Sequence, residues 1–397
     1  MNGVFSNILV SIAQAFFLCY NQTIMKIGID TFGCDHARSG LGTYLFSFAA
    51  HLSEASDVQT ELFGSQLDRF TYTSGKDILY NPVNVANSLH SERLWHFTSS
   101  GKFFASQKYD AVLFPAPERV LPVSFKTPGV AVVNSILSSQ IEGNCDWTQK
   151  LQIKRGLYKI QKIIAASHYI ASDLVNHGVS ADKIEVVYNG IDHKLFFPAI
   201  DFDDDIVDIK PFAIRRPYFI YGSRLSGPEK KHVELIKAFS LFKEKTKLPH
   251  RLVIAGSDGP YSAEVHKAAF ESPFASDIFL TGYFPHENFA QLYSGSDGCI
   301  FPSEAEGVGL PVLEAMATGV PVACSSACAL PEIAGDAALY FNSNNIEEIA
   351  LCMEKIVSDS ALKADMVKKG LEHSTCFSWE KTVSQTFDVA RRLVGMQ

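Results

Sequence analysis

Short apolar runs alternate with stretches of helical spacing along most of the chain, which predicts strands and helices in turn. The order is clearest from Phe301 to Ser326, FPSEAEGVGLPVLEAMATGVPVACSS. An apolar run that ends at Phe301 predicts a buried strand, Pro311 opens a short helix, and Gly319 ends that helix. The run VPVACSS then predicts a second strand. Such a unit is typical of parallel α/β domains, in which ligands bind at the carboxyl ends of strands.

The same order recurs in both halves of the chain. Residues Met25 to Leu52, MKIGIDTFGCDHARSGLGTYLFSFAAHL, predict a strand, a glycine-containing loop and a helix. Further strand ends lie in ELFGS, KYDAVLFPAP and TPGVAVVNS of the first half, and in RLVIAGSDGP, DIFLTGYFP and SDGCIFPS of the second. The sequence therefore predicts the α/β class, with two Rossmann-like doubly wound domains.

A change of composition marks the boundary between the two domains. The stretch AIDFDDDIVDIKPFAIRRP is first acidic and then basic and lacks periodicity, so we expect a linker at residues 199–217. Its run from Asp203 to Asp205 indicates a solvated charge run rather than a metal site. The linker separates an N-terminal domain, 25–198, from a C-terminal domain, 218–376, and an amphipathic helix is expected at 377–397.

The segment 1–24 is an apolar N-terminal extension without a charged residue. Its apolar part, Ile8 to Tyr20, is too short to span a bilayer, and the basic region of a signal peptide is missing. Two interpretations stay open. Translation starts at Met25, directly before a strand, or the segment is a helix that lies on the protein or on a membrane surface.

Composition and charge narrow the class of protein. The 397 residues are 47% hydrophobic and 20% charged, which fits a globular enzyme of two domains. The formal net charge of -8 argues against a nucleic-acid binder. The eight cysteines form no CxxC pair and no cluster with histidine at metal-ligand spacing, so we expect reduced thiols, a cytoplasmic protein and no metal site.

The loop before the helix that Pro311 opens is the first candidate site. Backbone amides at a helix amino terminus favour a phosphate, because they lack intrahelical partners and lie at the positive end of the helix dipole. The amides concerned belong to Gly307, Val308, Gly309 and Leu310. We expect Glu314 in the first helical turn, where its carboxylate can accept from two hydroxyls of a ribose, and Glu306 beside the group that the phosphate carries.

Two cations and two glycines are further candidate residues, and Asn134, at the end of the strand VAVVNS, is the last. Arg224 and Lys230 follow the predicted strand YFIYG, and a guanidinium and an ammonium at a strand end can neutralise a diphosphate. Gly40 and Gly42 occupy the turn into the first predicted helix, where the missing Cβ lets a ligand approach the backbone.

Glu306 and Glu314, with seven residues between them in EGVGLPVLEAMATGVPV, resemble the signature of retaining GT-B glycosyltransferases of family 4, the mannosyltransferase-like glycosyl transferases group 1. The resemblance covers about residues 25–393. It implies the GT-B fold, with two Rossmann-like domains facing a cleft and the C-terminal helix crossing back to the first domain. It also implies that Glu314 holds the nucleotide ribose, that Glu306 contacts the donor sugar, and that the loop of Gly40 and Gly42 faces the donor pyrophosphate and the acceptor.

The resemblance further implies an enzyme that moves a hexose, mannose or glucose, from a GDP- or UDP-linked sugar to a saccharide or lipid-linked acceptor, in cell-surface polysaccharide synthesis. Arg224, Lys230 and the loop amides would stabilise the departing diphosphate, so neither a cofactor nor a metal ion is expected. Such an enzyme would be cytoplasmic, with peripheral contact at the inner membrane face as an open alternative.

Four positions depart from the family's pattern. The strand VAVVNS ends in Asn134 and Ser135 where many members have His-Asp, Val308 replaces an aromatic residue, and Lys231 replaces an asparagine. An asparagine donates and accepts hydrogen bonds but carries no proton at neutral pH. A nucleotide-sugar-binding pseudoenzyme without transfer activity is therefore the alternative, and a related epimerase or phosphorylase is the third interpretation.

Overall fold

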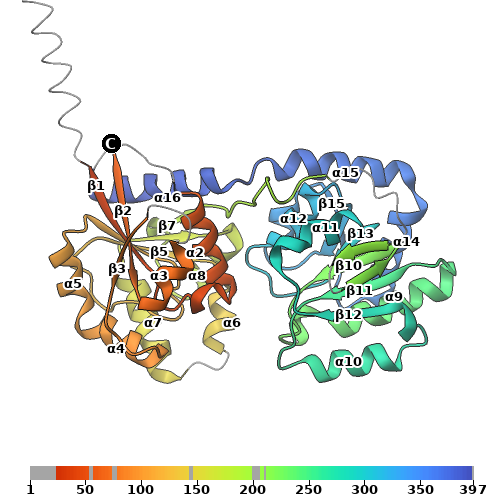
Figure 1. Cartoon of the computed structure of the whole chain (residues 1–397), viewed down its shortest axis with the longest axis horizontal. Coiled ribbons are helices and arrows are strands. Elements are labelled where there is room, and N and C mark those ends of the chain that lie inside the picture. Colours follow the sequence, from red (N-terminus) through yellow and green to blue (C-terminus); the bar gives the residue numbers. More distant parts are fainter. Residues whose placement is uncertain are drawn as a thin grey trace, which may run out of the picture. The chain divides into compact units, whose positions relative to one another are not determined.

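The structure is a computed structural model, and it describes residues 24–52, 57–73, 78–142, 146–198, 206–209 and 212–395. The chain divides into two compact units (Figure 1). Unit 1 comprises Met1–Val132, Trp147–Ile163 and Thr386–Gln397, and unit 2 comprises Val133–Asp146 and Ile164–Gln385.

A seven-stranded sheet has the order β3-β2-β1-β4-β5-β6-β7. The strand β1 pairs in parallel with β2 on one side and with β4 on the other, so the strand order reverses at β1, as in doubly wound sheets. The strands are β1 (Met25–Asp30), β2 (Val58–Gly64), β3 (Leu79–Pro82), β4 (Ala111–Phe114), β5 (Gly129–Val133), β6 (Lys162–Ala165) and β7 (Ile184–Val186). The helices between them are α2 (Gly40–Ala50), α3 (Gln66–Tyr72), α4 (Leu89–Thr98), α5 (Ser100–Gln107), α6 (Leu137–Glu142), α7 (Trp147–Lys159) and α8 (His168–Asn176), with short 3-10 turns η1 (Asp35–Ala37) and η2 (Ala181–Lys183).

A six-stranded parallel sheet lies within unit 2, with the order β12-β11-β10-β13-β14-β15. Its strands are β10 (Tyr218–Gly222), β11 (Arg251–Ala255), β12 (Ile278–Gly282), β13 (Gly298–Phe301), β14 (Val322–Ser325) and β15 (Ala338–Phe341). The helices of this part are α9 (His232–Thr246), α10 (Ser262–Glu271), α11 (Phe289–Ser294), α12 (Leu310–Ala317), α13 (Leu330–Ala334), α14 (Ile346–Ser358) and α15 (Ser360–Ser374), with 3-10 turns η3 (Pro228–Lys230), η4 (Ala275–Asp277) and η5 (His286–Asn288).

The central strands of both sheets are continuous apolar runs because helices cover both of their faces. The runs YFIYG of β10 and GCIF of β13 are buried at every position, and so are AVLF of β4 and GVAVV of β5. The predicted fold class, two Rossmann-like doubly wound sheets with helices, is confirmed.

The expected linker is not free of secondary structure. It contains two short antiparallel strands, β8 (Ile206–Ile209) and β9 (Phe212–Arg215). The burial alternates along both, and Val207, Ile209 and Ile214 pack into the core of unit 2. The expectation of a connector without periodicity was therefore wrong. The alternation in IVDI and FAIR was missed because it spans only four residues in each strand.

Two sequence expectations lie outside the described residues. They concern the acidic run from Asp203 to Asp205 and, except for Ile24, the apolar extension 1–24. Within the part of the chain that is described, no helix is both long and apolar enough to cross a membrane.

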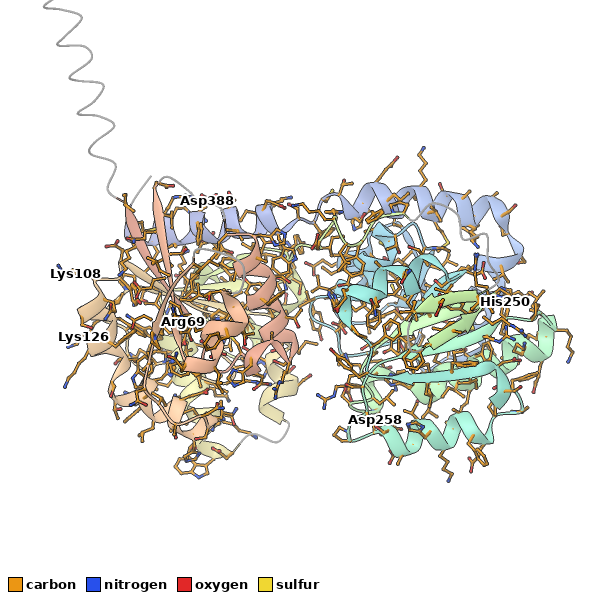
Figure 2. All side chains as sticks on the ribbon, in the orientation of Figure 1. Arg69, Lys108, Lys126, His250, Asp258 and Asp388 are labelled. Carbon is orange, nitrogen blue, oxygen red and sulfur yellow. The ribbon has the colours of Figure 1, made fainter. Side chains whose placement is uncertain are left out.

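The last helix, α16 (Trp379–Val394), begins in unit 2 and ends in unit 1. Its first turn packs closely on Gly190, where a Cβ would lie 2.1 Å from the backbone nitrogen of Trp379, and Thr382 Oγ1 donates to the carbonyl oxygen of Tyr188 at 2.8 Å. Its last turns are held in unit 1 by Arg391, whose Nε lies 2.7 Å from Asp57 Oδ2. Asp388, labelled in Figure 2, supports the same guanidinium at 2.7 Å.

Candidate functional site

A pocket of about 590 Å³ in unit 2 gathers four of the predicted site residues. Asn134 directly follows β5, Lys230 ends η3, and Glu306 and Gly307 belong to the loop before α12. The remaining lining residues are Ser135, Ile136, Ser139, Glu229 and Ala305. The pocket thus combines one cation, two carboxylates and an amide side chain, which suits a polar, charged ligand.

Lys230 lies at the wall of this pocket and is paired with Glu306, at 3.1 Å between Nζ and Oε2. The same Nζ donates to the carbonyl oxygen of Ala305 at 3.4 Å and to Ser303 Oγ at 3.5 Å. Both of these contacts are long, and hence weak. The ammonium can therefore exchange them for a phosphate oxygen at small cost while the pair with Glu306 keeps it in place.

Glu306 connects the lysine to the loop before α12. Its second oxygen, Oε1, accepts from the amide of Gly309 at 3.4 Å, and its carbonyl oxygen accepts from the amide of Ala329 at 3.1 Å. Gly309 has a φ of +68° and precedes the first residue of α12, Leu310. A side chain at this position would be strained and would lie 3.1 Å from Ile333.

Gly307 is fixed from the side of α8. Its carbonyl oxygen accepts from Ser167 Oγ at 2.8 Å, and a Cβ on this glycine would lie 2.9 Å from Ile170 Cδ1. Ser167 is fully buried and also caps α8, since its Oγ accepts from the amide of Ile170. This contact could not be predicted from the sequence, because 140 positions separate the two partners.

Asn134 presents an amide to the pocket with one half engaged. Its Oδ1 accepts from Asn189 Nδ2 at 2.8 Å, whereas its own Nδ2 is buried and makes no hydrogen bond to any described residue. A buried donor without a hydrogen bond costs about 1–3 kcal/mol of stability, so a hydrogen bond from Nδ2 to a ligand oxygen would be favourable. Asn189 orients this donor, and its contact with Asn134 was not predicted because an Asn-Gly pair is typical of a turn.

Glu314 is buried in α12. We expected it in the first helical turn, and this prediction was wrong. The helix begins at Leu310, one residue before Pro311, so Glu314 is the fifth helical residue. Its Oε1 lies 2.9 Å from Nε2 of His286. Glu314 is outside the lining of the 590 Å³ pocket, and so are the half-buried Val308 and Leu310.

His286 is a second partner that the sequence did not reveal. The side chain of His286 is 52% exposed, so desolvation lowers its pKa only in part. The hydrogen bond and the charge of Glu314 outweigh this desolvation, and the pKa of His286 is raised above 6.5. The edge of its ring meets Phe196, at 5.4 Å between the ring centroids. The contact with His286 therefore holds the rotamer of Glu314 from outside the helix.

Arg224 is not brought to the pocket with Lys230. Its side chain is exposed, and its Nε donates to the carbonyl oxygen of Asp258 at 3.4 Å. Asp258 is labelled in Figure 2 and follows β11. Of the two predicted cations, only Lys230 lines the pocket.

Gly40 and Gly42 form the first turn of α2 in unit 1, after the capping residue Ser39. A Cβ on Gly42 would lie 2.1 Å from the carbonyl oxygen of Cys34, whereas nothing lies within 4 Å of one on Gly40. Gly42 therefore permits close packing of its own chain. A role toward a ligand stays a prediction for both glycines.

The comparisons with known proteins agree with this arrangement of motifs. The family model described as Glycosyltransferase Family 4 matches residues 38–195, and the model described as Glycosyl transferases group 1 matches residues 203–373. The chain is a family 4-like glycosyltransferase. The family predicted from Glu306 and Glu314 is thereby confirmed.

Two curated relatives of this glycosyltransferase are mannosyltransferases of Escherichia coli. O-antigen chain mannosyltransferase B is 31% identical over 166 residues, which are 42% of this chain and 44% of the relative. The serotype-specific mannosyltransferase WbdA is 27% identical over 236 residues, 58% of this chain and 29% of the relative. The matched regions thus span less than half the length of either relative.

The fold of the glycosyltransferase has solved counterparts. Sucrose-phosphate synthase from Thermosynechococcus elongatus matches with a TM-score of 0.71 at 19% identity, over 94% of this chain and 99% of that chain. At this identity the match concerns the fold alone, and it confirms the GT-B class.

The pair of His286 and Glu314 can be tested by NMR titration of the imidazole. We expect Glu314→Gln to lower the pKa of His286, because burial then acts without the opposing carboxylate. Because the folded pKa is raised, the stabilisation from the pair is complete below pH 6.5 and is lost as the pH rises through the folded value. Glu287→Gln, which removes a weaker neighbouring charge, should cause a smaller fall. An unchanged titration in Glu314→Gln would contradict the pairing.

Proposed function

We propose that this glycosyltransferase moves a hexose, mannose before glucose, from a nucleotide-diphosphate sugar to a saccharide or lipid-linked acceptor, with retention of the anomeric configuration. The proposal rests on the pocket in which Lys230, Glu306 and the amide of Asn134 meet. The mannosyltransferase relatives support a hexose donor and a role in polysaccharide or glycolipid synthesis. Both GDP and UDP fit the pocket chemistry, since its cation and amides address phosphate.

Each part of the donor has a candidate partner in unit 2. Lys230 and the amides before α12 would take the diphosphate, because they are the positive groups at the pocket and at the helix amino terminus. Glu314, held by His286, would accept from the ribose hydroxyls. Glu306 and the free donor of Asn134 would contact the hexose. Arg224 would need to turn away from Asp258 to join them.

The reaction breaks the bond between the anomeric carbon and the diphosphate oxygen and forms a bond from the same carbon to an acceptor hydroxyl. Positive charge develops on the sugar ring, and negative charge on the departing phosphate, which the fixed Lys230 ammonium stabilises. On a front-face route the acceptor proton passes to that phosphate. No general base is then required, and the amide of Asn134 is sufficient to orient the sugar.

We propose that the enzyme needs no metal ion, because protein cations would supply the charge that a divalent ion supplies elsewhere. We expect it to act in the cytoplasm.

Lys230→Ala tests the role of the pocket cation. We expect turnover to fall on the order of 10²-fold, by analogy with the loss of one preorganised electrostatic donor. The matched control is Lys237→Ala, which removes an exposed lysine from the neighbouring helix α9 and should transfer sugar like the wild type. The measurement is turnover with the nucleotide sugar found by a thermal-shift screen, with the product's anomeric configuration read by NMR. Wild-type turnover in Lys230→Ala would contradict the proposed role of Lys230 in stabilising the departing diphosphate.

The pseudoenzyme remains the second candidate function, because Asn134 cannot titrate. If the position only orients the sugar, the wild type is active, Asn134→Ala loses turnover, and nucleotide binding survives. If a titrating imidazole is required, the wild type is weak or dead and Asn134→His raises its activity. Turnover of the three proteins separates the cases. Activity that appears only in Asn134→His would support the pseudoenzyme.

A further inference from the structure

A hollow of about 460 Å³ in unit 1 lies between the helices α4 and α7, both labelled in Figure 1. We call its rim the α4/α7 surface and define it by the residues Arg93, Leu94, Phe97, Trp147, Leu151 and Arg155. None of these residues belongs to the pocket of Lys230 and Glu306. The proposed transfer reaction makes no use of the surface.

The α4/α7 surface exposes large apolar side chains. Trp147 is 75% exposed, Phe97 64%, Leu94 62% and Leu151 58%. Single exposed apolar residues are ordinary, but four that line one hollow form a patch, and such patches mark interaction sites. They do not serve the core, because α7 buries Ile153 and Leu157 on its other face.

The charge of α7 is opposite to that of the whole chain. The formal net charge of the protein is -8, yet α7 carries four cations and no acidic residue. The cations are Lys150, Lys154, Arg155 and Lys159. Among the described residues that line the hollow, two are arginines and none is acidic. On α4, Glu92 uses its carboxylate to accept from the amide of Gly33.

The spacing along α7 places the two kinds of residue together. Trp147, Leu151, Arg155 and Tyr158 follow one another at intervals of four, four and three residues, so they share one helical face. A tryptophan, a tyrosine and several cations on the exposed face of an amphipathic helix are typical of a helix that lies in a membrane interface. Lysine is depleted in protein–protein interfaces, and three of the four cations are lysines.

We infer that the α4/α7 surface docks on an anionic phospholipid bilayer. Trp147, Phe97, Leu94 and Leu151 enter the boundary between headgroups and acyl chains. The lysines of α7 and Arg155 lie against lipid phosphates. This contact would bring the protein to the surface where a lipid-linked acceptor of the proposed function resides.

The test is binding of the full chain to vesicles, followed by co-sedimentation and by the fluorescence of Trp147. We expect binding to vesicles of phosphatidylglycerol and phosphatidylcholine, little binding to phosphatidylcholine alone, and weaker binding as salt rises. Lys154→Ala combined with Arg155→Ala should lower vesicle affinity roughly 20- to 30-fold, because each cation contributes about fivefold. Trp147→Ser should lower it further and abolish the blue shift of the fluorescence.

Phe270→Ser is the matched control, because Phe270 is 85% exposed on α10 of unit 2, outside the surface. It should bind vesicles like the wild type. Equal binding to neutral and anionic vesicles, or unchanged binding in the α7 variants, would overturn the inference. A concentration-dependent dimer that Trp147→Ser dissociates would also overturn it, since a second copy of the chain would then cover the surface. Transfer to a water-soluble acceptor should be the same in all these variants, which separates this inference from the proposed function.

Discussion

The ion pair between Lys230 and Glu306 is the contact on which the candidate site depends. It ties η3, which follows β10, to the loop between β13 and α12, because Glu306 binds the lysine with one oxygen and the amide of Gly309 with the other. The backbone reinforces the tie, since the amide of Glu304 donates to the carbonyl oxygen of Glu229 at 2.8 Å. The cation is thereby placed before any ligand arrives, so little reorganisation is needed when charge develops on a departing phosphate.

Two further contacts hold the residues around this pair. Ser167 fixes the carbonyl of Gly307, and Asn189 donates to the side-chain oxygen of Asn134, whose buried Nδ2 has no partner among the described residues. These supports leave the pocket with an unsatisfied donor, which is costly in the empty protein and favourable once a ligand oxygen binds. A pocket built in this way suits the sugar contact that we propose, with an asparagine where the family usually has a histidine.

Local sequence patterns were sufficient for the fold and for part of the site. Buried strands such as GCIF can be predicted from their continuous apolar character. Gly309 precedes a helix at a position with positive φ, which favours glycine. The pairs His286–Glu314 and Ser167–Gly307 could not be predicted, because tertiary folding joins positions 28 and 140 residues apart. The direction of Arg224 was equally hidden, since its long side chain can turn toward the pocket or toward Asp258. The start of α12 was misplaced by one residue because Pro311 is favoured at the first and the second helical position alike.

Calorimetry of nucleotide binding tests the account most directly, because it separates the two glutamates without an acceptor. Glu314→Ala should weaken the binding of the free nucleoside diphosphate and of the nucleotide sugar alike. The affinity should fall roughly 10- to 100-fold, because one charged hydrogen bond is lost. Glu306→Ala should bind the free diphosphate at least as tightly as the wild type, because Lys230 loses its counter-charge, and should bind the nucleotide sugar less tightly than the wild type. The reverse pattern would contradict the two roles: Glu306→Ala would then weaken the binding of the free diphosphate, and Glu314→Ala would leave that binding unchanged.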